Sequence, residues 1–178
     1  MSQYRIAVLV GSIRKDSLNR RLADAIARLA SPDFLFRQVQ IGDLPLYCQD
    51  DDDRQAESVR RLKQEIADAH GVLFVTPEYN RSIPGVLKNA IDHASRPHGE
   101  SVWAGKPAGI IGVSPGAVGT ALAQQHLRNI LASLDMPALG QPEAFLQAKE
   151  GLFDEDGCRS FLQKWMEKYM LWVKLHTI

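Results

Sequence analysis

The residues best suited to chemistry lie in a polar loop that separates two apolar stretches near the middle of the chain. Residues 77–83 read Pro-Glu-Tyr-Asn-Arg-Ser-Ile and combine a carboxylate, a phenol, an amide and a guanidinium. Such a mixture would suit a flat polar ligand with hydrogen-bonding edges. The same composition also suits an ordinary turn rich in Pro and Asn, and the loop by itself favours neither interpretation.

A second polar loop, at residues 11–19, comes just before a predicted helix. Ser12, Arg14, Ser17 and Asn19 provide two hydroxyls, a guanidinium and an amide. Free backbone N–H groups and the helix dipole favour an anion at such a position, and an arginine adds a bidentate donor, so the loop predicts a phosphate site. Simple capping by Ser17 or Asn19 is the alternative. The loop has neither Walker nor Rossmann glycine spacing, so a nucleotide site of either type is unsupported.

A third loop resembles a hydrolase motif. Residues 112–116 read Gly-Val-Ser-Pro-Gly, which matches the G-x-S-x-G nucleophile elbow, and acidic residues and His176 follow in the order of a triad. The oxyanion hole of such an elbow needs the backbone N–H of the residue after the serine, and Pro115 has none. Ser114 is therefore not expected to act as a nucleophile.

Alternating strands and helices must position these three loops. Short, continuously apolar runs indicate buried parallel strands, and longer segments with apolar residues at helical spacing indicate amphipathic helices. An aromatic stripe on the last helix, including Trp165 and Tyr169, is interpreted as core packing. The predicted strands span about residues 6–10, 34–41, 71–75, 108–113 and 145–146, and the predicted helices span about residues 18–30, 56–69, 85–94, 120–134 and 158–176.

This alternation predicts the α/β class, with a parallel sheet and right-handed crossovers. Five strands in 178 residues fit a flavodoxin-like three-layer sandwich in the strand order 2-1-3-4-5 better than a six-stranded dinucleotide domain. In this order the first, third and fourth strands are neighbours, so the three loops share the edge where open α/β sheets bind ligands. Because no repeat or linker interrupts the pattern, residues 1–178 are expected to form a single domain.

Residues 11–19, followed by 77–80 and by Lys-Asn-Ala-Ile-Asp at 88–92, resemble the NADPH-dependent FMN reductase family. Its members include bacterial quinone, azo-dye and chromate reductases. The resemblance covers about the first 150 residues, including Leu-Pro-Leu-Tyr at 44–47, and it implies a flavodoxin-like FMN-binding domain. Two departures stand out. His93 occupies a position where many relatives have Trp, and the tail beyond residue 151 matches least.

The resemblance also implies which residues hold the cofactor. The first loop would bind the FMN phosphate, the loop at 77–81 would line the isoalloxazine ring, and the loop after the fourth strand would cover its remaining flank. The implied cofactor-binding residues are Ser12, Arg14, Ser17, Leu18, Asn19, Pro77, Glu78, Tyr79, Asn80, Arg81, Ser114 and Gly116.

The implied activity places the redox chemistry on FMN, so no catalytic residue of the protein is predicted. Hydride from NADPH or NADH would pass through FMN to quinones or to azo, nitro, chromate or free-flavin acceptors. A single open flavin face used in turn predicts ping-pong kinetics. Glu78 either relays a proton or hydrogen-bonds within its loop, and Arg81 is a candidate partner for the nicotinamide phosphates.

A flavodoxin-type electron carrier that does not oxidise NAD(P)H directly is the alternative function. Such carriers are typically strongly acidic, whereas this chain has 21 Lys and Arg residues against 21 Asp and Glu residues. The same balance argues against nucleic acid and membrane surfaces as partners. The acidic run at residues 50–53 lacks the glycine and glutamate of a calcium loop, and the five histidines lack zinc spacing, so no metal is predicted.

The cellular location and the assembly follow from similar reasoning. The two cysteines, Cys48 and Cys158, form no CxxC motif, and the chain has no signal segment and no apolar run near the ~20 residues of a membrane span, which together indicate the cytoplasm. The family resemblance implies a homodimer or homotetramer. Ile83, Val86 and Leu87 are the candidate interface residues.

Overall fold

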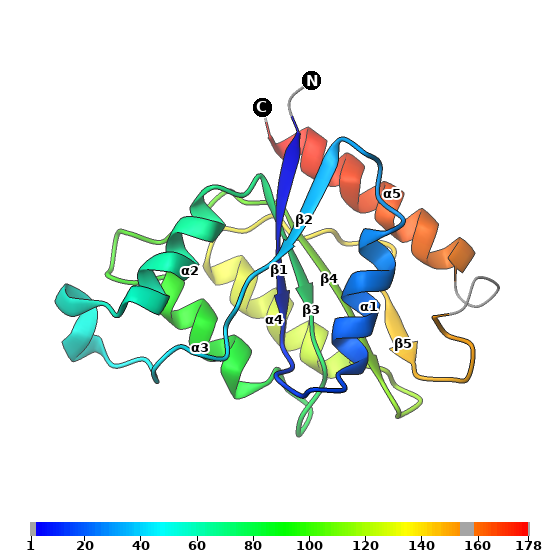
Figure 1. Ribbon diagram of the computed structural model, residues 1–178, viewed down its shortest axis with the longest axis horizontal. Coiled ribbons are helices and arrows are strands. Elements are labelled where there is room, and N and C mark those ends of the chain that lie inside the picture. Colours follow the sequence, from blue (N-terminus) through cyan, green and yellow to red (C-terminus); the bar gives the residue numbers. More distant parts are fainter. Residues whose placement is uncertain (1–2, 154–158, 178) are drawn as a thin grey trace.

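The computed structural model describes residues 3–153 and 159–177, and in this part of the chain the strands form a five-stranded parallel sheet (Figure 1). The order β2-β1-β3-β4-β5 confirms the predicted flavodoxin-like topology. Successive strands are joined through helical crossovers, as parallel pairing requires. The strands are β1 (Tyr4–Val10), β2 (Phe34–Gln38), β3 (Gly71–Val75), β4 (Ala108–Ser114) and β5 (Phe145–Gln147).

The three central strands end side by side. Val10 of β1 pairs with Val75 of β3, which in turn pairs with Ile111 of β4. Nearly all residues of these strands are buried, because helices cover both faces of the sheet, and this explains their continuous apolar sequences. The loops after β1, β3 and β4 consequently leave the sheet at the same edge, the lower one in Figure 1.

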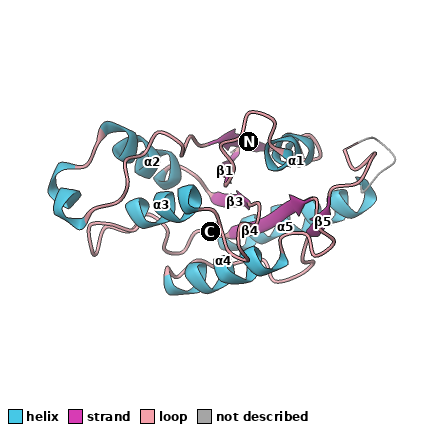
Figure 2. Ribbon diagram, turned by 90° about the horizontal axis from the view of Figure 1, so that it is seen from below, coloured by secondary structure: helices cyan, strands magenta, loops and turns pink. Residues whose placement is uncertain are grey.

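Helices lie on both faces of the sheet and complete three layers (Figures 1 and 2). The pair α1 and α5 packs into one apolar cluster with one face of the sheet, and α2, α3 and α4 pack into a second cluster with the other face. Within the described residues, every helix is too short or too polar to cross a bilayer. The helices are α1 (Leu18–Ala27), α2 (Glu57–Ala67), α3 (Gly85–Ala94), α4 (Ala121–Ser133) and α5 (Arg159–His176).

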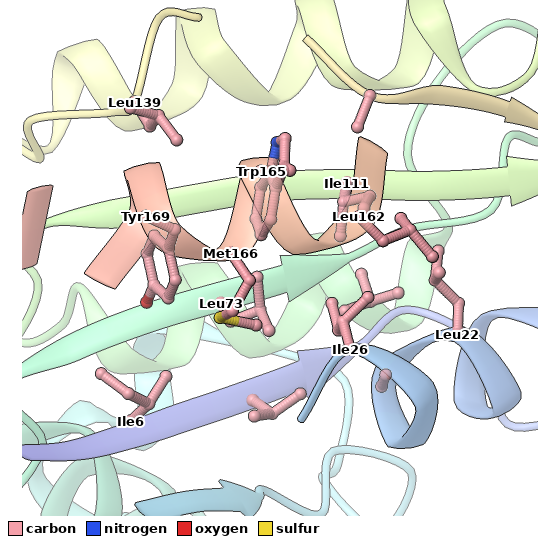
Figure 3. Packing of buried hydrophobic residues seen from close by; sticks show 14 of the residues in the cluster. Ile6, Leu22, Ile26, Leu73, Ile111, Leu139, Leu162, Trp165, Met166 and Tyr169 are labelled. Atoms are coloured by element: carbon pink, nitrogen blue, oxygen red, sulfur yellow. The ribbon is translucent and has the colours of Figure 1, made fainter. Parts of the chain in front are cut away.

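The aromatic stripe of α5 lies in the core, as predicted (Figure 3). The rings of Trp165 and Tyr169 stack with their centroids 5.6 Å apart, and both side chains are fully buried. A Cβ atom on Gly109 of β4 would lie only 2.7 Å from the Tyr169 ring. The absence of a side chain at residue 109 therefore allows α5 to lie close against the sheet.

Several predicted element ends are corrected by the structure. Helix α1 ends at Ala27 rather than near residue 30, because the N–H groups of Leu29 and Ala30 bond to carbonyls three residues back in a tighter turn. Strand β2 ends at Gln38 rather than Ile41, although the apolar pattern continues, because the chain leaves the sheet after Val39 bonds to β1. The acidic run forms the 3₁₀ helix η1 (Gln49–Arg54), and the predicted helix start at residue 158 lies outside the described residues.

Candidate functional site

A cleft of about 100 Å³ opens among the loops after β1, β3 and β4. Nine of the twelve residues predicted to bind the cofactor line it, whereas Asn80, Arg81 and Gly116 do not. Val113 and Pro115 also line the cleft and were not predicted as site residues. The lining consists of Ser12, Arg14, Ser17, Leu18, Asn19, Pro77, Glu78, Tyr79, Val113, Ser114 and Pro115.

The N-terminus of α1 forms one wall of the cleft. Ser17 is the N-cap residue, and its hydroxyl accepts a hydrogen bond from the backbone N–H of Arg20 at 3.2 Å. The N–H groups of Leu18 and Asn19 have no acceptor among the residues that the structure describes. Capping by Ser17 therefore coexists with two free donors at the positive end of the helix dipole, which is a suitable arrangement for an anion.

Two further donors lie in the same loop. Ser12 is buried and Arg14 is exposed, and neither side chain has a hydrogen-bond or ion-pair partner within the described part of the chain. The Ser12 hydroxyl is not among the buried unpaired atoms, so it is accessible at the cleft to a ligand or to water. Together with the free N–H groups of α1, these side chains provide the donors that a phosphate monoester requires.

Asn19 has a structural contact that was not expected. Its side chain is 3% exposed and bonds to both backbone groups of Val113: Nδ2 donates to the carbonyl at 2.9 Å, and Oδ1 accepts from the N–H at 3.0 Å. These bonds fasten the start of α1 to the end of β4. The backbone N–H of Asn19 and the second N–H of its Nδ2 remain as donors for the phosphate contact that the sequence predicted.

The loop after β3 ends in a tight two-residue hairpin. Tyr79 and Ser82 exchange backbone hydrogen bonds of 3.1 and 3.0 Å, and Asn80 and Arg81 between them have φ values of 52° and 62°. Each left-handed residue other than glycine costs about 1–2 kcal/mol, with Asn at the lower end. The hairpin presents the half-exposed Tyr79 ring and the unpaired N–H groups of Asn80 and Arg81, none of which bonds to a described residue.

The carboxylate of Glu78 bonds to a helix on another part of the chain. Its Oε2 accepts hydrogen bonds from the N–H groups of Leu122 and Ala123 in the first turn of α4, both at 3.0 Å. Thr120, at the N-cap of α4, makes no side-chain capping bond, and its hydroxyl accepts from the Gln124 amide instead. Glu78 is thus a hydrogen-bonding residue, but its partners lie on α4 and not within its own loop as expected.

The loop after β3 contacts α4 at a second point. Ser82 Oγ lies 3.0 Å from His126 Nδ1 on α4.

The loop after β4 is held by a hydrogen bond from its own serine. The hydroxyl of Ser114 donates to the carbonyl of Gly119, whose φ is +64°. Because the Ser114 hydroxyl is engaged within its own loop, the structure agrees with its exclusion as a nucleophile.

His93 and Asn89 of α3 hold the segment that follows β2. Asn89 accepts from the N–H of Tyr47 and donates to the carbonyl of Pro45, both at 2.8 Å. His93 Nε2 lies 2.9 Å from the same carbonyl, so this nitrogen carries the proton, and the His93 ring contacts Tyr47 edge-on. The role of residue 93 is thus to anchor this segment, and Leu46 within it is 87% exposed.

The residues predicted to form a subunit interface are mostly buried in the core of the chain itself. Leu87 is fully buried and Ile83 is 9% exposed, and both pack in the cluster between the sheet and helices α2 to α4. Only Val86 is partly accessible. The helical spacing was correctly recognised, but the apolar face of α3 faces the core of its own chain.

The cleft fits one end of a ligand the size of FMN. Pockets that enclose drug-sized molecules measure about 300–1,000 Å³, so a cleft of about 100 Å³ holds a phosphate and adjoining atoms only. The flat part of such a ligand would extend beyond the cleft, against the exposed Val118 and against the exposed parts of Tyr79 and Pro115, which also line the cleft. The donor set at α1 and the exposed aromatic and apolar rim both suit this division.

Comparisons with known proteins show which sequences and structures this chain resembles. The family model described as NADPH-dependent FMN reductase matches residues 4–151. A 2-hydroxy-1,4-benzoquinone reductase from a Burkholderia species is 55% identical over 176 residues, which cover 96% of each chain. A quinone reductase from Pseudomonas putida is 48% identical, covering 99% of this chain and 98% of that protein.

A solved structure is similar over the whole chain as well. FerB from Paracoccus denitrificans, a flavoenzyme NAD(P)H:(acceptor) oxidoreductase, superposes with a TM-score of 0.93 at 43% sequence identity. The alignment covers 98% of this chain and 100% of FerB. The similarity therefore extends through α5, beyond residue 151, where the sequence resemblance was weakest.

Proposed function

The chain belongs to the NADPH-dependent FMN reductase family, and on this basis we propose that it binds FMN and uses NADPH or NADH to reduce quinones. The observation that carries the proposal is the cleft where unpaired donors at the N-terminus of α1 meet the exposed hairpin after β3. Quinone reductases are also named among its full-length relatives, which supports the same class of acceptor.

The residues of the cleft have distinct roles in this proposal. Ser12, Arg14 and the N–H groups at the start of α1 hold the phosphate, and Tyr79 lies against the ring. The unpaired N–H groups of Asn80 and Arg81 are donors suited to stabilise negative charge at the ring edge. When bound, FMN supplies the two-electron redox chemistry.

In this proposal, the nicotinamide nucleotide and the electron acceptor reach the flavin over the same open rim. Arg81 stands at the exposed hairpin tip without an ion-pair partner in residues 3–153 and 159–177, so it is our candidate contact for the nicotinamide phosphates. Azo, nitro, chromate and free-flavin acceptors fit the same open rim. Because one open rim serves both substrates in turn, we expect ping-pong kinetics, with parallel lines in double-reciprocal plots.

We infer that the protein works as a cytoplasmic homodimer or homotetramer. Exposed apolar side chains on the loops that follow the strands support association: Ile13, Leu46, Tyr79 and Val118 are all about half exposed or more. A second subunit placed over this edge would enclose the part of the ligand that the small cleft leaves uncovered. The exposed free thiol of Cys48 suits a reducing compartment.

Initial-rate measurements test this function. With FMN-loaded protein, we expect benzoquinone reduction with NADPH or NADH as the electron donor. With the apoprotein, and no FMN added, we expect no reduction. A protein that binds FMN but oxidises neither nucleotide would instead be an electron carrier. The ratio of kcat/KM for the two nucleotides would identify the preferred donor.

A further inference from the structure

We propose that Glu78 is a positioning residue for the flavin, because its carboxylate fastens the loop that lines the ring to the N-terminus of α4. The inference rests on the proposed function, since it assigns how this chain shapes its own FMN site. Glu78 lies 44 residues before Leu122 in the sequence, yet one of its oxygens accepts from two successive N–H groups of α4. Such double acceptance by a carboxylate at a helix N-terminus is a strong, directional contact.

The contact at Glu78 gives the first turn of α4 a hydrogen-bond acceptor and gives the loop after β3 a fixed attachment point. The side chain of Thr120 leaves the first turn of α4 uncapped, and Glu78 satisfies two of the N–H groups that a helix always leaves unpaired. In return, the contact with the helix fixes the position of Glu78, which directly precedes Tyr79 in the loop. The second contact, between Ser82 and His126, fixes the other end of the hairpin to the same helix.

The hairpin between these contacts needs such support. An isolated two-stranded hairpin is marginal in water, and this one consists of a single pair of mutual backbone bonds around two left-handed residues. Without the contact at Glu78, the backbone of Asn80 and Arg81 can relax to right-handed conformations. The Tyr79 ring and the free N–H groups would then leave the positions from which they line the flavin.

The first experiment compares two acidic residues at helix N-termini. Glu78→Ala removes the contact to α4, and Glu57→Ala removes the first-turn acid of α2, which lies away from the cleft. We expect Glu78→Ala to raise the FMN Kd of the apoprotein by ~10-fold, to shift the visible spectrum and the midpoint potential of bound FMN, and to speed hydrogen exchange at Tyr79 and Ser82 in the apoprotein. We expect Glu57→Ala to change none of these.

A second variant separates positioning from simple helix stability. Ala121→Asp places a carboxylate in the first turn of α4, where it can stabilise the helix but, because it belongs to the helix, does not tie the loop to it. Glu78→Ala should also lower the thermal midpoint, because two N–H groups of α4 lose their acceptor. In the double variant Glu78→Ala/Ala121→Asp, we expect the thermal midpoint to recover while the FMN Kd and the exchange rates remain altered. Recovery of all three would overturn the proposal and reduce Glu78 to a helix cap. Should Glu78→Ala not fold, Glu78→Gln, which keeps an acceptor but loses the charge, should show the same changes to a smaller extent.

Measurements on the unmodified protein distinguish failure of the proposed function from failure of the positioning role of Glu78. If it binds no FMN, the proposed function fails and the positioning role fails with it. If it binds FMN and oxidises NADPH while Glu78→Ala leaves flavin affinity, spectrum and apoprotein exchange unchanged, only the positioning role is refuted. Altered flavin properties in Glu78→Ala, with unchanged properties in Glu57→Ala, support the proposal.

Discussion

Arg14 and Asn19 lie in the same loop, yet their side chains have different surroundings. Arg14 is exposed and has no partner in the described chain, whereas the amide of Asn19 is buried against the backbone of Val113. Arginine is therefore available to a ligand, and asparagine holds protein to protein. Sequence alone could not separate these roles, because the partner of Asn19 is 94 residues away.

Arg14 should contribute directly to FMN affinity. For Arg14→Ala we expect binding to weaken by about 2 kcal/mol, or roughly 30-fold in Kd, the scale of a charge-assisted phosphate contact. Titration of the apoprotein with FMN, followed by flavin fluorescence, measures the change. Arg28→Ala, at the exposed C-terminal end of the same helix, is the matched control and should bind as the unmodified protein does. Equal affinity of the two variants would remove Arg14 from the phosphate site.

Asn19 should contribute to stability whether or not FMN is present. Asn19→Ala leaves the N–H and carbonyl of Val113 buried without their partner, so we expect the free energy of unfolding to fall by roughly 2–3 kcal/mol. Urea denaturation of the apoprotein measures it. Asn129→Ala, on the exposed face of α4, should change stability little. A loss of flavin affinity with no loss of stability would contradict this assignment.

The packing of α5 against β4 depends on a glycine. Adding a Cβ at residue 109 places it 2.7 Å from the Tyr169 ring and 3.1 Å from Trp165, so Gly109→Ala should destabilise the protein by about 1–3 kcal/mol. Gly85→Ala, at the start of α3, meets open space and should be neutral or stabilising by up to about 1 kcal/mol. Thermal unfolding of the two variants compares them. Similar midpoints would show that α5 does not pack closely at residue 109.

The junction between α2 and β3 should respond to pH through His70. Its Nδ1 accepts a hydrogen bond from the backbone N–H of Arg5 at 3.0 Å, and burial, followed by the charges of Arg5 and Lys106, lowers its pKa below the usual 6.5. Because the unfolded chain binds a proton more readily, this stabilising contribution is complete above pH 6.5 and is lost as the pH falls through 6.5 toward the folded pKa.

The pH effect can be isolated by comparing the unmodified protein with His70→Gln. We expect the unmodified protein to lose more unfolding free energy than the variant between pH 7.5 and 5.5, as measured by urea denaturation at each pH. The other histidines are common to both proteins, so the difference reports His70. An identical pH dependence in the two proteins would show that His70 titrates normally.

The elements were predictable where a local pattern controls them. The runs at β1, β3 and β4 are apolar because both faces are covered, and from them the strand order and the shared edge of the three loops followed. Non-local contacts were not predictable. Glu78 was recognised as polar and suited to the site, but its partner is the first turn of α4, and the buried faces of Ile83 and Leu87 depend on how α3 packs.

At the scale of the whole molecule, one edge of the sheet gathers the phosphate donors, the hairpin and the exposed apolar residues. This edge has a small open cleft and a wide exposed rim, an arrangement suited to a cofactor whose reactive part must meet two different substrates. Helices cover both faces of the sheet, and the unpaired donors at the start of α1 and the hairpin after β3 meet only at this edge among the described elements. The activity of the protein is therefore assigned to this edge.

The central claim is that FMN bound at this edge is reduced directly by a nicotinamide nucleotide. The most direct test is an anaerobic visible spectrum of the FMN-loaded protein, recorded before and after stoichiometric NADPH and, separately, NADH. We expect the visible absorbance of the bound flavin to bleach with at least one nucleotide and to return when a quinone is added. A bound flavin that stays oxidised with both nucleotides would contradict the reductase assignment, and failure to bind FMN would contradict the site itself.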